Sequence, residues 1–251
     1  MRFEQVFILG MPRARSTFYQ AFINEELLGG IIHETQLLTH KSLRYLGLVL
    51  LVKVGLCKAA VPVNYLFERH QSGFFRAQHH RFTAADLNIT ASDALANDAC
   101  GPASMLGFFF SVVKERYNVS VVGVRHHMNP LFIPLYRSRV ESRGFVIVTR
   151  PFSEIFKSKL IWENRGAKHG SVETRIAAFL KLVPVWAAVK VAVLFYGHRD
   201  DVSVIHHVDG EDDNQVRNLC RFLGVQYSEG MGDAIGLVDS SHDLASQKPR
   251  G

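Results

Sequence analysis

A short segment near the start of the chain, residues 6–22, constrains the fold more than any other. It reads VFILGMPRARSTFYQAF: four apolar residues suit a buried strand, and Gly10 and Pro12 then turn the chain. After Ser16 and Thr17 the apolar residues recur at helical spacing. A strand, a tight loop and a helix start in this order are typical of an anion-binding turn, because the first-turn backbone N–H groups lack intrahelical partners and carry partial positive charge.

Two cations in the same loop strengthen this interpretation. Arg13 and Arg15 lie on either side of Ala14, directly before the two hydroxyl residues. The alternative is an ordinary strand-to-helix turn with a Ser or Thr cap. The convergence of a proline, two arginines and a Ser-Thr pair on one short loop favours a phosphate site.

The loop differs from a Walker A sequence at the positions that matter for ATP. Gly10 and Thr17 stand where GxxxxGK[ST] has its first Gly and its hydroxyl residue, but Arg15-Ser16 replaces the Gly-Lys pair. The Lys that reaches the terminal phosphates of ATP is therefore missing. The cation comes earlier in the loop, at Arg13.

Residues 12–17, PRARST, resemble the 5′-phosphosulfate-binding loop of sulfotransferases, which reads PRSGTT or PKSGTT. The departures are Ala14 for the usual Ser and Arg15 for the usual Gly, the residue that lets backbone approach a ligand closely. The resemblance implies that the cofactor contacts the whole loop: Pro12, Arg13, Ala14, Arg15, Ser16 and Thr17.

A second segment with a similar organisation begins at the apolar run 145–148. This predicted strand is followed by Arg150, by a proline at the helix start, and by Ser158 eight positions after the arginine. The pattern resembles the second sulfotransferase signature, which implies that Arg150 and Ser158 hold the 3′-phosphate of the cofactor. A Walker B strand would end in Asp, so the arginine here disfavours a magnesium-dependent ATPase.

Two weaker resemblances involve residues further along the chain. Arg125 lies 25 residues before Arg150, where many sulfotransferases have a KTP-like triplet, and this implies a helper cation for the bridging sulfate oxygen. Residues 211–227 resemble the late FLG segment of the family, a helix that Gly224 ends. In the family a late basic loop closes over the 3′-phosphate, and only Lys248 and Arg250 suggest one here.

Glu34 is the predicted catalytic base. In tyrosylprotein sulfotransferases the PRSGTT loop is followed by a GEET segment that carries the catalytic Glu, and its distance from the loop arginine equals the 21 positions from Arg13 to Glu34. The alternatives are His33, His126 and His127, because histidine titrates near neutral pH and the cytosolic sulfotransferases use it.

The whole chain of 251 residues suits one α/β domain, 1–251, with strands and helices in alternation. The resemblance implies a three-layer P-loop NTPase-like fold with a central parallel sheet flanked by helices. Residues 36–118 match the family hardly at all, and we expect them to form a helical or irregular substrate-side insertion; residues 64–97 are expected to be irregular.

Charge and cysteine content limit the classes of ligand and partner that suit this chain. The net charge of +6 suits an anionic nucleotide, but no run of Lys and Arg interleaved with aromatics predicts nucleic acid binding. Three widely spaced cysteines predict neither a disulfide framework nor a zinc site and fit a cytoplasmic chain without a secretory signal. Charges interrupt the most apolar stretch, residues 43–63, so it predicts a buried or substrate-lining helix rather than a membrane-spanning one, with a membrane-surface helix as the minor alternative. Membrane contact is not expected of the chain.

The reaction implied by the resemblance is sulfuryl transfer from 3′-phosphoadenosine 5′-phosphosulfate to an acceptor hydroxyl or amine, with adenosine 3′,5′-bisphosphate as product and no metal. Three acceptors stay open: a small metabolite, a sugar and a tyrosine. Two alternatives stay open: a P-loop kinase-like phosphotransferase and a catalytically silent nucleotide-binding module.

Overall fold

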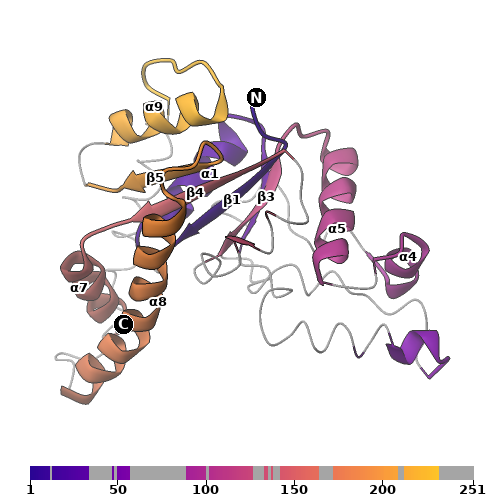
Figure 1. Ribbon diagram of the computed structural model, residues 1–251, viewed down its shortest axis with the longest axis horizontal. Coiled ribbons are helices and arrows are strands. Elements are labelled where there is room, and N and C mark those ends of the chain that lie inside the picture. Colours follow the sequence, from indigo (N-terminus) through magenta and orange to yellow (C-terminus); the bar gives the residue numbers. More distant parts are fainter. Residues whose placement is uncertain are drawn as a thin grey trace, which may run out of the picture.

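The computed structural model describes residues 1–11, 13–33, 47, 50–56, 89–99, 102–126, 133–134, 137, 142–163, 172–208 and 212–231. At its centre lies a five-stranded parallel sheet with the order β2-β3-β1-β4-β5 (Figure 1). The strands are β1 (Gln5–Gly10), β2 (Gly30–His33), β3 (Val122–His126), β4 (Arg143–Thr149) and β5 (Val202–His206). After its first residue each of β1 and β4 is buried throughout, as expected for strands covered on both faces. The predicted α/β architecture is confirmed.

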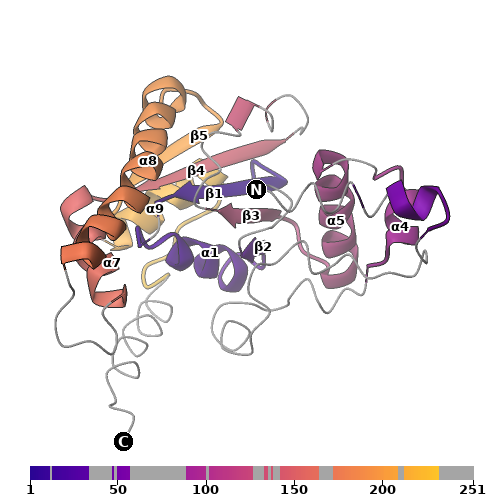
Figure 2. The same cartoon turned by 90° about the horizontal axis from the view of Figure 1, so that it is seen from below.

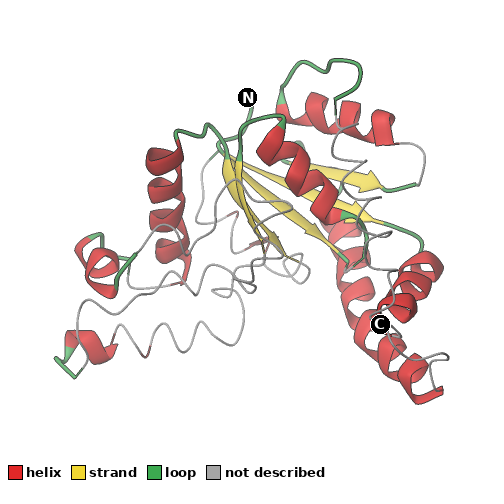
Figure 3. Ribbon diagram, turned by 180° about the vertical axis from the view of Figure 1, so that it is seen from behind, coloured by secondary structure: helices red, strands yellow, loops and turns green. Residues whose placement is uncertain are grey.

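Helices cover both faces of the sheet. The helix α1 (Ser16–Glu25) contacts β1, β2 and β3, and α9 (Asp212–Leu223) contacts β5. The helix α8 (Val172–Tyr196) contacts β4 and lies on the face opposite α1, as the views of Figure 1 and Figure 3 show together. At the other end of the molecule from α8 and α7 (Phe152–Glu163) lie α4 (Ala91–Ala96) and α5 (Pro102–Tyr117) (Figure 2).

The strand order reverses at β1, in the middle of the sheet. From β1 the chain passes to β2 and back to β3 on one side, and then crosses to β4 and β5 on the other. Open α/β sheets bind ligands outside the strand ends at such a reversal. In the register of the pair, Gly10 of β1 lies beside Val148 of β4, so the two loops that resemble cofactor motifs leave neighbouring strands at the same edge.

Two glycines allow the central strands to approach closely. A Cβ atom built on Gly123 in β3 would lie 1.7 Å from the carbonyl oxygen of Val6 in β1. On the other side of β1, a Cβ on Gly10 would lie 2.6 Å from the carbonyl oxygen of Val148. Both distances are far below contact, so the pairing of β1 with its two neighbours requires a residue without a side chain at each position.

The structure differs from the sequence-based expectations in two places. The continuous β-branched run at 119–124 predicts a strand there, and the structure has it as β3, Val122–His126, which begins and ends later. The stretch expected to be irregular contains α4, which a capping box begins: Thr90 accepts from the N–H of Asp93, whose carboxylate accepts from the N–H of Thr90. Most of the helix expected over 130–143, and of the insertion before residue 89, lies outside the described residues.

Residues 170–196 predict one long helix or two, with Pro184 as the site of a kink, and the structure has a single helix there. The helix α8 continues through Pro184 for 25 residues, with a mean hydropathy of 1.9 over its most apolar window. Among the described residues it is the one helix whose length and composition would suit a membrane span, and 28% of that window is buried inside the protein.

Candidate cofactor site

The loop between β1 and α1 is anchored in the core and turned by two left-handed residues. Met11 and Ala14 are fully buried, and the N–H of Ala14 donates to the carbonyl of Met11 at 3.2 Å. Arg13 and Arg15 have φ values of 68° and 60°, in the region that favours glycine. Buried residues thus alternate in this loop with arginines whose side chains are at least partly exposed. Pro12 is not among the described residues.

Arg15 shows why the resembled loop carries glycine at this position. It is the N-cap residue of α1, it has left-handed backbone, and its side chain makes no capping hydrogen bond. A non-glycine residue in this conformation costs on the order of 1 kcal/mol, and such strain is characteristic of functional loops. The chain therefore keeps the backbone path that glycine normally supplies, with the arginine side chain half-exposed beside it.

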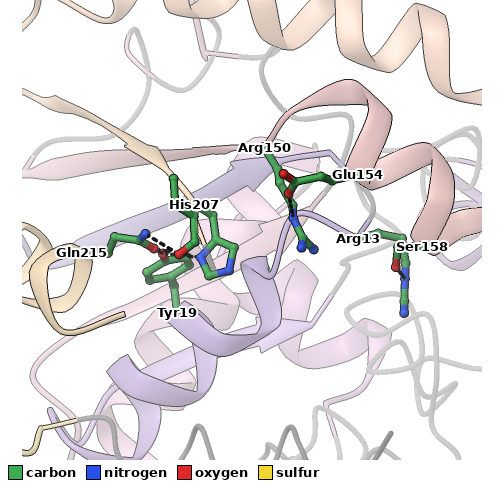
Figure 4. A network of polar contacts seen from close by, with 8 residues as sticks. Arg13, Tyr19, Arg150, Glu154, Ser158, His207 and Gln215 are labelled. Carbon is green, nitrogen blue, oxygen red and sulfur yellow. Dashed lines mark hydrogen bonds and ion pairs between the residues drawn. The ribbon is translucent and has the colours of Figure 1, made fainter. Parts of the chain in front are cut away.

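Arg13 and Ser158 bring the two candidate motifs together. The Nε of Arg13 donates to the hydroxyl of Ser158 at 3.0 Å, although the residues are 145 positions apart (Figure 4). Arg13 is exposed and Ser158, on α7, is half-buried, so the contact lies at the protein surface. A loop predicted to bind the 5′-phosphosulfate and a serine predicted to bind the 3′-phosphate are therefore direct neighbours.

Arg150 forms an ion pair that the sequence analysis did not consider. Its Nε lies 2.7 Å from a carboxylate oxygen of Glu154, one turn into α7 (Figure 4). Arg150 precedes α7, and its side chain is only 14% exposed against 43% for Glu154, so the ion pair is partly buried. The Arg-x-x-x-Glu spacing in the sequence was the signal for this pair, and it indicates that the guanidinium is held against α7.

Arg125 is buried beneath α1. Its side chain donates from Nε to the amide oxygen of Gln20 at 2.9 Å and from Nη1 to the hydroxyl of Ser16 at 3.0 Å. Only 3% of Arg125 is exposed, so the predicted helper cation lies behind the loop and reaches it through Ser16. Gln20 in turn donates to the carbonyl of Ile31 at 3.0 Å, which connects this cation to β2.

A buried polar cluster fixes α1 to the other end of the sheet. The hydroxyl of Tyr19 donates to the amide oxygen of Gln215 at 2.5 Å, and the Nδ1 of His207 lies 2.8 Å from the same oxygen (Figure 4). All three side chains are buried, and no local sequence pattern predicted their contact.

Cys220, also on α9, has a structural role. Burial raises the pKa of its thiol, which leaves it a poor nucleophile.

The candidate bases follow the ends of β2 and β3. In the strand register His33 lies beside Arg125, and His126 lies beside Leu9 of β1, so both histidines are at the carboxyl edge. Glu34 comes directly after His33 in the sequence but lies outside the described residues, as do His127, Lys248 and Arg250. The choice between Glu34 and a histidine stays a prediction.

One hollow of about 350 Å³ lies at the face of α5, within the part of the chain expected to serve the acceptor. None of the predicted cofactor residues lines it. Its lining consists of Asn97, Ser104, Gly107, Phe108, Ser111, Val112 and Glu115.

Comparison with known proteins identifies the fold. No protein-family model matches the sequence. No curated protein sequence matches it either. The structure is similar to a sulfotransferase domain from the curacin biosynthetic pathway, with a TM-score of 0.53 and 16% identity, over 90% of this chain and 75% of that one. It is also similar to the sulfotransferase STF1 from Mycobacterium tuberculosis H37Rv, with a TM-score of 0.51 and 10% identity, over 94% and 71% of the two chains. The chain therefore has the α/β fold found in sulfotransferases.

Proposed function

We propose that this chain transfers a sulfuryl group from 3′-phosphoadenosine 5′-phosphosulfate to an acceptor hydroxyl or amine. The observation that carries the proposal is the hydrogen bond from Arg13 to Ser158, because it joins the two segments that resemble sulfotransferase cofactor motifs. Their strands are direct neighbours in the sheet. The similarity of the fold to two sulfotransferase structures supports the same conclusion.

The hydrogen-bond donors at the carboxyl edge of the sheet suit a nucleotide that carries anionic groups at both its 5′ and its 3′ position. We assign the 5′-phosphosulfate to Arg13, to the first-turn N–H groups of α1, and to the hydroxyls of Ser16 and Thr17. We assign the 3′-phosphate to Arg150 and Ser158. Glu154 holds the Arg150 guanidinium from the first turn of α7, and a phosphate bound there would add charge-assisted hydrogen bonds to the same cation.

Each residue has a task in the proposed reaction. The bound donor supplies an activated sulfuryl group with a phosphate oxygen as the leaving atom. Arg13 stabilises the negative charge that develops at this oxygen, and Arg125 adds positive charge from beneath the loop through Ser16. Glu34 takes the proton of the acceptor as its oxygen or nitrogen attacks sulfur.

A thermal-shift experiment tests the choice of nucleotide. At about a hundred times its Kd, adenosine 3′,5′-bisphosphate should add about 2.7 kcal/mol of stability, or roughly 5–10 °C in Tm for a chain of this size. ATP with Mg²⁺ should give a clearly smaller shift, because the loop lacks the Walker lysine. A larger shift with ATP and Mg²⁺ would favour the kinase-like alternative. Bisphosphate binding without turnover on a panel of acceptors would identify a silent module.

Arg150→Ala should separate the two phosphates of the nucleotide. Charge-assisted bonds to phosphate contribute about 1.5–3 kcal/mol, so the variant should bind adenosine 3′,5′-bisphosphate more than about tenfold more weakly while its affinity for 5′-AMP stays nearly unchanged. Isothermal titration calorimetry with both ligands measures this difference. Glu154→Gln is the matched control, because it removes the ion pair and leaves the cation in place. Equal losses for both ligands in Arg150→Ala would show that the 3′-phosphate binds elsewhere.

A further inference from the structure

The helix α8 exposes an apolar stripe along the face opposite the sheet. Its buried positions repeat along one face: Ala178, Leu182, Val185, Val189 and Ala192. At 3.6 residues per turn, Ile176, Leu180, Val191 and Leu194 lie within about 40° of the opposite direction. Their exposed fractions are 54%, 64%, 49% and 75%.

This stripe is unusual because solvent-facing positions of a surface helix are normally polar. A helix that is apolar on all sides is typical of a buried or membrane environment. Here the buried side already packs on the domain, and the outer side faces solvent. Clustered exposed apolar side chains mark an interaction surface, in contrast to single ones.

The helix is a rigid platform, since aromatic rings join it to α7. Phe152 of α7 lies 5.7 Å from Phe179 and 5.8 Å from Trp186 of α8, measured between ring centroids. Phe156 of α7 lies 6.2 Å from Phe179. On the neighbouring helix Ile161 is 70% exposed, so the apolar surface continues onto α7.

Charges beside the stripe indicate which partner covers it. The helix carries three cations, Arg175, Lys181 and Lys190, and a single acid, Glu173, all of them exposed. Long basic side chains on the flanks of an apolar stripe place their charges at the level of lipid headgroups. Two copies of α8 packed against each other would instead bring together two helices that each have a net charge of +2.

We propose that the outer face of α8, together with Ile161 of α7, docks on an anionic lipid surface. The helix lies along the surface and does not cross it, because five buried positions spread over its length hold it against the protein. This inference reverses the expectation of no membrane contact, and it does not depend on the proposed sulfotransferase activity. Figure 2 shows α7 and α8 together at one end of the molecule, away from α4 and α5.

Flotation of the full chain with lipid vesicles tests the proposal. The protein should bind vesicles of equal parts phosphatidylcholine and phosphatidylglycerol at least about tenfold better than pure phosphatidylcholine, and high salt should reduce binding. Leu180→Glu and Leu194→Glu should each lower the partition coefficient by about tenfold, since each removes a buried leucine side chain from the lipid contact. The double variant Lys181→Gln/Lys190→Gln should lose several-fold on the anionic vesicles only.

Leu28→Glu is the matched control, because Leu28 is 56% exposed, lies outside α7 and α8, and follows the buried Leu27. Its binding should stay within about twofold of the wild type, and circular dichroism verifies that every variant is folded. Unchanged binding of both α8 leucine variants, or a loss confined to Leu28→Glu, would overturn the proposal. A wild-type dimer that Leu180→Glu dissociates, with no vesicle binding, would assign the face to a second copy and would also overturn it.

Discussion

Arg13→Ala is expected to reduce kcat by about a hundredfold. Removing one preorganised group that stabilises developing charge typically costs about 10²–10³ in rate, and Arg13 is an exposed cation of the loop between β1 and α1. The affinity for adenosine 3′,5′-bisphosphate should fall as well, because the same cation contacts the ground-state phosphate. Turnover at saturating donor, measured beside the Kd from calorimetry, separates the two effects.

Two controls make the Arg13 result interpretable. Arg13→Lys keeps the charge but loses the planar donor set that reaches Ser158, so it should recover part of the rate. Arg217→Ala removes an exposed arginine that pairs with Asp213 on α9, and it should leave kcat unchanged. Full turnover of Arg13→Ala at saturating donor would mean that another residue stabilises the leaving oxygen.

Glu34→Gln is expected to lose at least a hundredfold in turnover while its affinity for adenosine 3′,5′-bisphosphate stays within a few-fold of the wild type. General-base removal typically costs about 10²–10⁴ in rate. The residue follows β2 directly in the sequence, and β2 ends in register with Arg125, at the same edge as the phosphate loop. Single-turnover rates at saturating donor measure the chemical step without product release.

The histidines at this edge provide the counter-experiment for the base. His33→Ala and His126→Ala remove the imidazoles at the ends of β2 and β3, and both variants should retain most of the wild-type rate. If Glu34→Gln turned over normally while either histidine variant was inactive, the base would be a histidine. The resemblance to tyrosylprotein sulfotransferases would then be limited to the loop between β1 and α1.

The sequence was sufficient to predict the elements that depend on local pattern. Continuous apolar runs identified β1 and β4, because strands buried on both faces need no polar alternation. Apolar residues at helical spacing over 102–117 predict the helix that the structure has as α5, Pro102–Tyr117. The adjacency of β1 and β4 is what we expect of two strands that each carry a loop resembling part of one cofactor site.

Features that depend on tertiary contact could not be predicted in the same way. The burial of Arg125 follows from the docking of α1 on β3, and a strand-end arginine gives no local sign of it. The contact of Tyr19 with Gln215 joins residues 196 positions apart. By contrast, the apolar outer face of α8 is a local pattern, since Ile176, Leu180, Val191 and Leu194 recur at helical spacing in the sequence.

Gly123 has a consequence for how this chain can diverge. A side chain there would overlap the carbonyl of Val6, so no other residue can replace this glycine unless β1 and β3 move apart. Such a separation would break the register that places His126 beside Leu9. A glycine in the middle of an apolar, β-branched strand is therefore a marker for aligning remote homologues to this protein. It would serve where the overall sequence identity is too low for an alignment.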